Sequence, residues 1–484
     1  MKKRIFDLIS AEYEKLILIF DEDNIIDRID YAAYIKGSGF NISFYQDVEE
    51  FRFLYESEIR NSKENWAVIV TSDIYVPFDI RKAMYIANLS MSRIFSKLDR
   101  NTLLSHKVDF ELLSLAYEEL FELCNSYDKT IRFIENIVYG NKNLEKYCEV
   151  LDKEIKNSIM VSELSYINWI DMAKKKGRLE YFSAKLDQTF DLKFVEDAFK
   201  DFILNKYNSL SGIMNNNGPV MLTRVLEYIA RGNRKTALIV MDGMSIFDFE
   251  IISKEFDNIL FDYNCCYALI PTTTSISRQS LLSGKYPVEL KNPFNLAKEE
   301  YEFRSTAETL GYKKNQISYE RGYNLNLSPI VKFVSIIIND IDDLVHNQMQ
   351  GRHGMLNDIE YYAKKGELQH LVSDLYSNGF DIYITSDHGN TLCTGVGKPK
   401  GLGIEVETRS KRMMVLKEFA DKGIYGDCGE ISYPGYYLDK QYEYLICESG
   451  SSYDIQDEIV MTHGGMSIDE VIVPFIKIKG VKNG

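Results

Sequence analysis

The sequence has no long apolar run, no C-x-x-C pair of cysteines and no excess of positive charge. None of its windows approaches the roughly 20 apolar residues of a membrane-spanning helix. The run LILIF (16–20) that follows the charged start MKKR is too short for a signal peptide. These absences favour a soluble, cytoplasmic protein without a membrane partner.

Negative charge dominates the chain. Lysine and arginine number 57 against 72 aspartates and glutamates, which gives a formal charge of −15. Nucleic-acid binding over a broad surface depends on neutralising phosphates with basic side chains, so this balance argues against such a surface. The negative charge balance does not exclude a small anionic substrate that binds to metal ions held by the protein.

The cysteines exclude two further classes of protein. The chain has seven, an odd number, and they include no C-x-x-C pair. A disulfide framework and a zinc knuckle are therefore disfavoured. Because 45% of the residues are apolar, a full hydrophobic core is expected instead.

Three regions differ in sequence pattern. Residues 1–90 contain the short apolar runs LILIF (16–20) and WAVIV (66–70), each ending in an acidic or hydroxyl-containing turn, which predicts a small α/β module. Residues 91–233 place apolar side chains at helical spacing, as in FELLSLAYEELFELC (110–124), and end in the basic stretch ARGNRK (230–235). We interpret this part as a helical region with a linker. Residues 234–484 form the third region.

Short apolar runs recur through residues 234–484, and segments able to form helices separate most of them. The runs are TALIVMDG (236–243), NCCYALIP (264–271), VKFVSIIINDID (331–342), DIYITSDHG (381–389) and RMMVLKE (412–418). Runs that are apolar on both faces and alternate with helices predict an α/β fold, with a mainly parallel sheet and helices on both faces. Open sheets of this kind bind ligands beyond the carboxyl ends of their strands.

Four of these runs, and one later segment, end at side chains that can ligate a metal or attack a substrate. They are Asp242, the hydroxyls of Thr272 to Ser275, Asp342 with His346, Asp387 with His388, and His463 in the turn THGG. Each aspartate alone is more often a turn former or a helix cap. The joint pattern favours a site, because the sequence has six histidines and three of them stand beside such acids or in a Gly-Gly turn.

The spacing of these residues agrees with metal binding. If Asp342 begins a helical turn, His346 at i+4 lies on the same face, and one ion could take both side chains. Asp387 and His388 are consecutive, so in an extended turn they point apart and suit two parts of a bimetallic centre. Mixed carboxylate and imidazole ligands favour zinc, with manganese as an alternative. Two such ions can clamp the attacking and leaving oxygens of a phosphoryl transfer.

Four segments of the last region resemble the PglZ domain of the alkaline phosphatase superfamily. They are VMDGMS (240–245), PTTTSISRQSLLSGKYP (271–287), NDIDDLVH (339–346) and THGGMSIDEVIVP (462–474), the last being the most specific. The resemblance covers roughly residues 234–480 and implies an alkaline-phosphatase-like catalytic domain with two divalent metal ions. Family members from phage-defence systems carry an extension before this domain.

The resemblance also implies a role for each candidate residue. One set of metal ligands is matched by Asp342, His346 and His463, and the other by Asp242, Asp387 and His388. Thr274 matches the nucleophile, which would also bind metal. Arg278 matches the basic residue of the same motif and could hold a phosphate oxygen bidentately.

The sequence therefore predicts a metal-dependent hydrolase with a threonine nucleophile. The resemblance favours a phosphodiesterase for nucleotide-type substrates, a small phosphodiester or an oligonucleotide, in a bacterial phage-defence (BREX-like) system whose proteins contact residues 1–230. The alternative is an assembly or regulatory subunit of such a system, with a weakly active or structural metal centre. A sulfatase is disfavoured because SISR (275–278) lacks the proline of C/S-x-P-x-R. A phosphoglycerate mutase, which uses a serine in a different setting, is disfavoured too.

Five further side chains have open roles. Asn390, Thr391 and Lys398 follow the DHG turn and could face the substrate. Lys398 and Lys400 in GKPKG are either phosphate contacts or, more commonly, part of a solvated loop. His353 is close enough in sequence to the D-x-x-x-H segment to enter the site, and a loop position is the commoner alternative.

Overall fold

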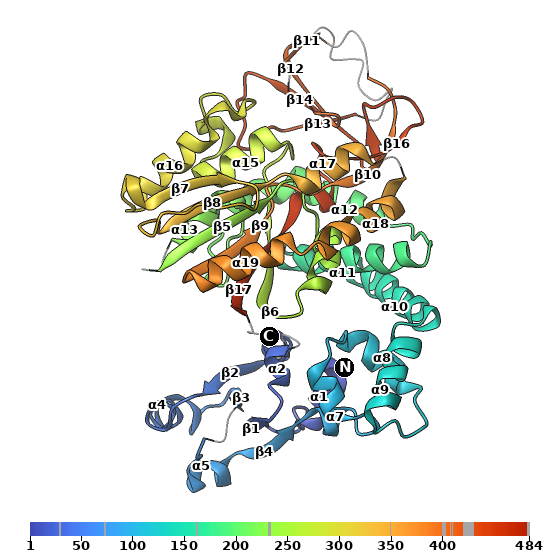
Figure 1. The fold of residues 1–484 in the computed structure, drawn as a ribbon, viewed down its shortest axis with the longest axis vertical. Coiled ribbons are helices and arrows are strands. Elements are labelled where there is room, and N and C mark those ends of the chain that lie inside the picture. Colours follow the sequence, from blue (N-terminus) through green and yellow to red (C-terminus); the bar gives the residue numbers. More distant parts are fainter. Residues whose placement is uncertain are drawn as a thin grey trace. The chain divides into compact units, whose positions relative to one another are not determined.

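A computed structural model describes residues 1–28, 31–71, 74–160, 163–230, 234–348, 350–398, 403–406, 408, 410–419 and 430–481. The chain forms two compact units, Met1–Glu149 and Val150–Gly484. The domain boundaries suggested by the sequence, at residues 90 and 233, stay predictions. Residues 231–233 of the expected linker lie outside the described residues. Figure 1 labels the elements of both units.

The first unit contains a parallel sheet of four strands in the order β2-β3-β1-β4. The strands are β1 (Leu16–Asp21), β2 (Phe40–Tyr45), β3 (Asn65–Val70) and β4 (Tyr85–Leu89). The apolar runs LILIF and WAVIV form the two central strands. Their middle residues are buried, as expected where helices cover a parallel sheet.

Helices surround and follow this sheet. They are α1 (Lys2–Leu8), α2 (Ile25–Arg28), α3 (Tyr31–Gly37), α4 (Val48–Leu54), α5 (Phe78–Ala83), α6 (Met91–Ile94), α7 (Arg100–Ser105), α8 (Phe110–Glu118) and α9 (Tyr127–Phe133). Helix α8 begins where the Asp109 carboxylate accepts hydrogen bonds from the backbone N–H groups of Glu111 and Leu112. Helix α10 (Asn141–Ile159) spans the division between the two units.

The second unit is built on a six-stranded sheet in the order β6-β17-β9-β5-β8-β7. Its strands are β5 (Lys235–Met241), β6 (Ile259–Tyr267), β7 (Ile317–Arg321), β8 (Phe333–Ile338), β9 (Phe380–Thr385) and β17 (Ile472–Val481). Strands β7, β8, β5 and β9 are parallel, and β17 runs antiparallel to both β9 and β6. The sheet is therefore mainly parallel, which confirms the predicted fold class.

Helices pack against this sheet in two groups. Helices α11 (Tyr166–Lys185), α14 (Ile246–Ile252) and α18 (Gly351–Lys364) pack on one another, and α13 (Val225–Ile229), α15 (Thr274–Ser283) and α16 (Glu299–Thr309) form another group. In Figure 1, α15 and α16 lie on one side of the central strands and α19 (Glu367–Ser377) lies on the other. The remaining helices are α12 (Lys193–Lys206), α17 (Asp340–Asn347) and α20 (Ile468–Val471). Among the described residues, no helix is both long and apolar enough to span a lipid bilayer.

Two smaller sheets extend this unit. One is antiparallel, in the order β11-β12-β14-β13, and the other has the order β15-β10-β16. Their strands are β10 (Thr391–Gly395), β11 (Gly403–Val406), β12 (Met413–Phe419), β13 (Glu430–Tyr433), β14 (Glu443–Cys447), β15 (Ser451–Ser452) and β16 (Ile459–Thr462).

One predicted strand joins a different sheet. The run RMMVLKE (412–418), grouped with the parallel strands from its sequence, forms β12 of the antiparallel sheet. Its residues 413 to 416 are all buried, and continuous burial produces the same apolar run in either kind of sheet. The grouping was wrong for this physical reason.

Candidate metal centre and nucleophile

The carboxyl ends of β5 and β9 bring two buried aspartates together. Asp242 directly follows β5, and its backbone N–H still pairs with β8. Asp387 follows β9, and its Oδ1 accepts from the backbone N–H groups of Gly243 at 3.2 Å and of His388 at 3.0 Å. Gly243 has a φ of +73°, and a Cβ there would lie 3.2 Å from Oδ1 of Asp342. The turn after β5 therefore depends on glycine to approach the other acids.

His388 is fully buried, and its two ring nitrogens have different partners. Nδ1 lies 3.1 Å from the carbonyl oxygen of Gly389. Because a carbonyl oxygen only accepts, the proton sits on Nδ1 and Nε2 keeps its lone pair. Nε2 lies 3.0 Å from Oγ1 of Thr274, 3.6 Å from Oδ1 of Asp242 and 3.9 Å from Oδ2 of Asp387. In this arrangement Nε2 accepts the hydrogen bond of the threonine hydroxyl and also faces both carboxylates.

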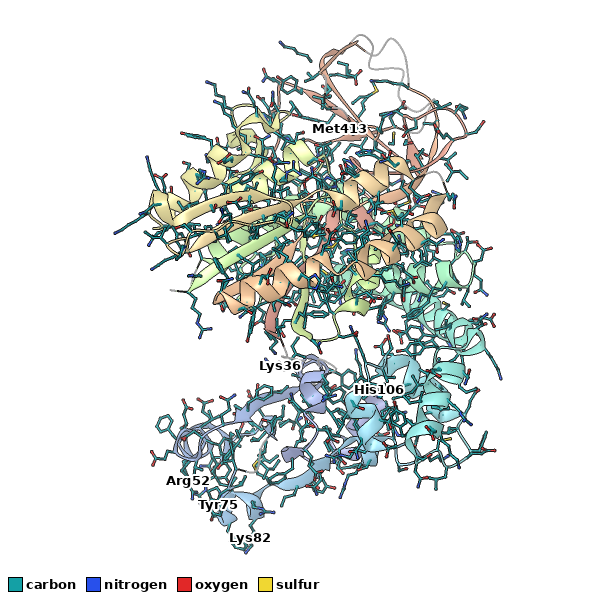
Figure 2. The ribbon with its side chains drawn as sticks, in the orientation of Figure 1. Lys36, Arg52, Tyr75, Lys82, His106 and Met413 are labelled. Atoms are coloured by element: carbon teal, nitrogen blue, oxygen red, sulfur yellow. The ribbon has the colours of Figure 1, made fainter. Side chains whose placement is uncertain are left out.

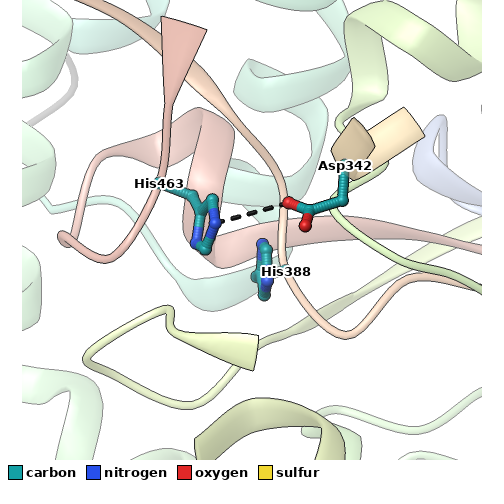
Figure 3. Close-up of side chains that lie close together, drawn as sticks. All are labelled: Asp342, His388 and His463. Carbon is teal, nitrogen blue, oxygen red and sulfur yellow. Dashed lines mark ion pairs between the residues drawn. The ribbon is translucent and has the colours of Figure 1, made fainter. Parts of the chain in front are cut away.

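A second cluster joins Asp342, His388 and His463, as Figure 3 shows. Asp342 lies in the first turn of α17, and its Oδ1 is 3.4 Å from Nε2 of His463. The His388 and His463 rings stack with centroids 4.1 Å apart and planes at 17°. Nδ1 of His463 donates to the carbonyl oxygen of Thr272 at 3.1 Å, so its Nε2 lone pair also points into the cluster.

His346 lies at the rim of this cluster, and its side chain is 51% exposed. Its Nε2 is 3.5 Å from Oδ2 of Asp342, in agreement with the i, i+4 spacing on α17. The same nitrogen is 3.4 Å from Nε2 of His463. Two imidazole nitrogens that face each other need a proton or another cation between them, because two lone pairs repel.

Three carboxylate oxygens at these clusters lack a hydrogen-bond partner within the described part of the chain. They are Oδ1 of Asp242, Oδ1 of Asp342 and Oδ2 of Asp387. A buried carboxylate oxygen without a partner is costly unless a cation compensates it. The donor atoms of Asp342, His388 and His463 all lie within 4.8 Å of one another, and so do those of Asp242, Asp387 and His388. This donor set fits two adjacent cations.

The pKa values of the aspartates show how crowded the negative charge is. Burial, together with the nearby Asp387 carboxylate, raises the pKa of Asp242 to about 8. Burial also raises the pKa of Asp387 to about 6, although the Arg278 guanidinium lowers it. Burial acts on Asp342 in the same direction, but the hydrogen bond with His346 and the neighbouring histidine charges outweigh it and hold its pKa below the usual range. A bound cation would favour the ionised form of each carboxyl group.

The same environment favours a neutral imidazole at His463. Burial is the main cause that lowers its pKa to about 4, and a second proton on His388 would act in the same direction. A histidine must be unprotonated to ligate a metal, so this shift keeps the ring in its ligating form near neutral pH.

The predicted metal ligands all lie at this site, but their grouping differs from the predicted sets. His388 contributes to both clusters, whereas the sequence placed it in only one. His346 was predicted in the set with Asp342 and His463, and it approaches both residues from the exposed side. The assignment of ligands to two metal ions stays a prediction.

Thr274 occupies the first position of α15, directly after the buried Thr273. It is only partly buried, so its hydroxyl is more accessible than those of Thr272 and Thr273. The positive end of a helix dipole favours an anion at this point. A phosphate next to Thr274 would therefore meet both the hydroxyl and the helix N-terminus.

Arg278 lies one turn further along α15 and is almost fully buried. Its Nη1 donates to Oδ2 of Asp242, and its Nε donates to Oε2 of Glu299 at 2.8 Å. Glu299 also accepts from the Tyr319 hydroxyl at 2.7 Å and pairs with Arg321. The guanidinium is thus held between two carboxylates, and its predicted contact with a phosphate oxygen stays a prediction.

Two residues after the DHG turn point into the protein. Asn390 is fully buried, and its Nδ2 donates to the carbonyl oxygen of Gly243 at 2.9 Å and to Oδ2 of Asp248 at 2.6 Å. Thr391 donates from its hydroxyl to Oδ2 of Asp469 at 3.3 Å. Both therefore fix the loop that carries His388.

The other open candidates lie elsewhere. Nδ1 of His353 is 3.3 Å from the carbonyl oxygen of Ala184, and the residue belongs to α18. Lys398 forms an exposed ion pair with Glu405 at 2.8 Å. Lys400 lies outside the described residues.

Sequence reasoning missed one buried carboxylate at the site, that of Glu470. It accepts hydrogen bonds from Gly465, Ser467 and Thr272. The sequence signal was present in THGGMSIDEVIVP, where an acid directly precedes the apolar run VIVP. Glu299 was missed as well, and its sequence surroundings gave no sign of the pairing with Arg278.

Comparison with known proteins agrees with the resemblance drawn from the motifs. The family model described as the BREX system PglZ alkaline phosphatase-like domain matches residues 220–478, more than half of the chain. No curated protein sequence matches. Similar solved structures include murine ectonucleotide pyrophosphatase / phosphodiesterase 5, at 12% identity and a TM-score of 0.37, covering 50% of this chain and 88% of that one. The human protein of the same name gives 13% identity and a TM-score of 0.36, covering 50% and 87%.

Proposed function

Because the chain belongs to the family of BREX system PglZ alkaline phosphatase-like domains, we propose that it is a two-metal phosphodiesterase acting through Thr274. The substrate class is a nucleotide-type phosphodiester, either small or an oligonucleotide. The observation that carries the proposal is the group of three unpartnered carboxylate oxygens, in the described part of the chain, around the nitrogen that bonds the Thr274 hydroxyl.

Two sets of side chains would hold the metal ions. Asp242, Asp387 and His388 form one set, and Asp342, His463 and the shared His388 form the other, with His346 at the rim. Carboxylate oxygens mixed with imidazole nitrogens suit zinc, with manganese as the alternative. Bound divalent ions at such a site lower the pKa of a coordinated hydroxyl or water and neutralise charge on the phosphoryl oxygens.

The chain's own residues would act on the phosphodiester in two stages. Thr274 loses its hydroxyl proton, and its oxygen attacks phosphorus while the bond to the leaving alcohol breaks, so that one phosphothreonine ester forms and one alcohol departs with a proton. Water then attacks phosphorus and the bond between phosphorus and the Thr274 oxygen breaks. This step restores the threonine hydroxyl and releases a phosphomonoester. The N-terminus of α15 favours the anionic phosphate in both stages.

In this proposal Arg278 has a role other than binding a phosphate oxygen directly. Its hydrogen bonds to Asp242 and Glu299 hold the Asp242 carboxylate at the end of β5. A guanidinium with two buried carboxylate partners is poorly placed to exchange them for a substrate. We therefore assign Arg278 to the orientation of Asp242.

The decisive experiment is the Thr274→Ala substitution. Hydrolysis of bis(p-nitrophenyl) phosphate with added zinc or manganese should fall by about 10³-fold or more, with the content of bound metal little changed. Thr274→Ser should keep part of the activity, because it restores a hydroxyl. Thr309→Ala is the matched control, since that hydroxyl bonds the Ser305 carbonyl oxygen of its own helix. Unchanged turnover in Thr274→Ala would exclude this nucleophile.

We also propose that the first unit binds a protein partner of the same defence system. The helices that carry Phe53 and Phe78 are joined by an Arg52–Asp79 ion pair, and the two phenylalanines are 77% and 75% exposed. Tyr75, labelled in Figure 2, is 71% exposed. Large exposed aromatic side chains are typical of interaction surfaces. Phe53→Ser with Phe78→Ser should weaken co-purification with proteins of that system without changing phosphodiester turnover.

The proposed location of the enzyme is the cytoplasm. Six cysteines lie in the described part of the chain, and each has a free thiol. Free, mostly buried thiols are typical of a reducing compartment.

A further inference from the structure

The buried Glu470 carboxylate lies where three site-bearing loops meet. Glu470 ends the segment THGGMSIDE, lies in α20 shortly before β17, and has no solvent exposure. A buried carboxylate is stable only when hydrogen bonds and an opposite charge compensate it. Its partners therefore show what the residue organises.

The first loop it holds carries His463. Oε1 of Glu470 accepts from the backbone N–H of Gly465 at 2.8 Å. Oε2 accepts from the backbone N–H of Ser467 at 3.0 Å and from the Ser467 hydroxyl at 2.6 Å. These bonds close the loop that follows His463 into a fixed turn.

The second loop it holds carries Thr274. The Thr272 hydroxyl lies 3.2 Å from Oε1 of Glu470 and 3.0 Å from the carbonyl oxygen of Gly465, and it accepts from the Gly464 N–H at 3.2 Å. The Thr272 carbonyl oxygen in turn bonds Nδ1 of His463 at 3.1 Å. Thr272 therefore transmits the position of Glu470 to both the nucleophile loop and a histidine.

The third loop carries His388. The backbone carbonyl oxygen of Glu470 accepts from the N–H of Gly389 at 2.9 Å. A Cβ at position 389 would lie 1.9 Å from the carbonyl oxygen of Asp469, so only glycine allows the two backbones to approach this closely. The loop after β9 is thus fixed against the same residue as the other two.

Arg412 supplies the opposite charge. Its Nη1 donates to Oε2 of Glu470 at 2.7 Å, and neither side chain has any solvent exposure. Arg412 immediately precedes β12 of the antiparallel sheet, and its Nη2 donates to the carbonyl oxygen of Glu448. A Cβ at Gly465 would lie 2.8 Å from Cζ of Arg412, which explains the second glycine of THGG. The antiparallel sheet is thereby connected to the site.

We propose that Glu470, neutralised by Arg412, is the positioning residue that holds the Thr274, His388 and His463 loops in their mutual arrangement. This inference rests on the proposed function for its catalytic consequence. Its structural content, three loops held by one carboxyl residue, is independent of turnover.

The first test measures hydrogen exchange in the metal-free full chain. Glu470→Gln alone would leave the Arg412 charge buried and unpaired, so the neutral pair Glu470→Gln with Arg412→Met is used. A carboxamide has a single acceptor oxygen, so the bonds to Gly465 and Ser467 cannot both be kept. Exchange should become about tenfold faster in peptides covering 270–275 and 462–468, which bond the carboxylate, and should increase less in 386–391, which bonds the backbone carbonyl oxygen of Glu470. Acceleration limited to 462–468, or equal acceleration throughout the second unit, would refute the proposal.

The second test uses Thr272→Val, which removes the hydroxyl link without burying a new charge. Apparent zinc affinity, measured by competition with a chromogenic chelator, should fall by about 10- to 100-fold. If the protein hydrolyses phosphodiesters, kcat should fall by a similar factor while KM changes less. Glu250→Gln is the control, because that buried carboxylate pairs with Arg178 of α11. Zinc affinity equal to that of the unsubstituted protein would refute the transmitting role of Thr272, whatever the outcome for Thr274→Ala.

Discussion

The Thr274 hydroxyl oxygen lies 3.0 Å from Nε2 of His388, the nitrogen that belongs to both carboxylate clusters. The donor and the shared ligand come from loops after different strands, 114 residues apart in sequence. A cation that binds the lone pair on Nε2 of His388 would break the hydrogen bond between this nitrogen and the Thr274 hydroxyl. Metal binding and the availability of the hydroxyl are therefore coupled through one histidine.

This sharing predicts an unequal effect of two histidine substitutions. His388→Ala should lower the zinc content of the dialysed protein from two ions toward none, because it removes a ligand from both clusters. His346→Ala should reduce it less, since that side chain lies at the exposed rim. Elemental analysis by mass spectrometry gives both values. Equal losses in the two variants would argue against a shared ligand.

Glu299 should matter for stability because it is the second partner of the buried Arg278. Glu299→Gln removes the carboxylate that pairs with Nε of the buried guanidinium and should lower the free energy of unfolding by about 3–5 kcal/mol. Glu302→Gln on the same helix breaks the more exposed pair with Lys285 and should cost about 1 kcal/mol or less. Urea unfolding compares them, and similar losses would contradict the role given to Glu299.

Zinc should stabilise the second unit selectively. A ligand that binds only the folded state, at a free concentration 100 times its Kd, adds about 2.7 kcal/mol to the free energy of unfolding. Hydrogen exchange of the full chain, resolved by peptide, should therefore slow within Val150–Gly484 and stay unchanged within Met1–Glu149. Equal protection of both units would mean that the metal does not act through the clusters at β5 and β9.

A pH dependence is expected at Glu196, away from the metal clusters. Burial raises its pKa to about 7, against the lowering effect of the nearby Lys176 ammonium group. A carboxyl group with a raised folded-state pKa binds its proton more tightly when folded, so its contribution to stability is present at low pH and is lost as pH rises through 7. The free energy of unfolding should fall between about pH 4.5 and 7, and Glu196→Gln should flatten this slope. A slope identical in both proteins would assign it to another group.

The sequence predicted that these aspartates and histidines lie close together because most of them follow buried strands. Asp242 and Asp387 each lie within two residues of a strand end, and parallel neighbours deliver such residues to one edge of a sheet. The sharing of His388 was not predictable, because it depends on the ring's tilt toward the second cluster. That tilt follows from the bond to Gly389 and the stacking on His463. The spacing of residues in the sequence reveals neither contact.

Buried ion pairs between residues distant in sequence could not be predicted from the sequence. Arg412 and Glu470 are 58 residues apart, and Arg278 and Glu299 are 21 apart across a loop and a turn. Each of these residues looks like an ordinary surface charge when it is read alone. Burial makes them specific partners, and burial is set by the packing of the sheets rather than by the local sequence.

The central position of β17 has a consequence for folding during synthesis. β17 lies between β9 and β6, and β6 joins the central sheet through it, although β17 comes after every other strand of that sheet in the chain. Until β17 leaves the ribosome, β6 remains an unpaired edge open to association with other chains. The parallel sheet of the first unit is complete by Leu89 and can form long before. A nascent chain would thus carry an early folded first unit while the central sheet of the second unit is completed only when translation of β17 is finished.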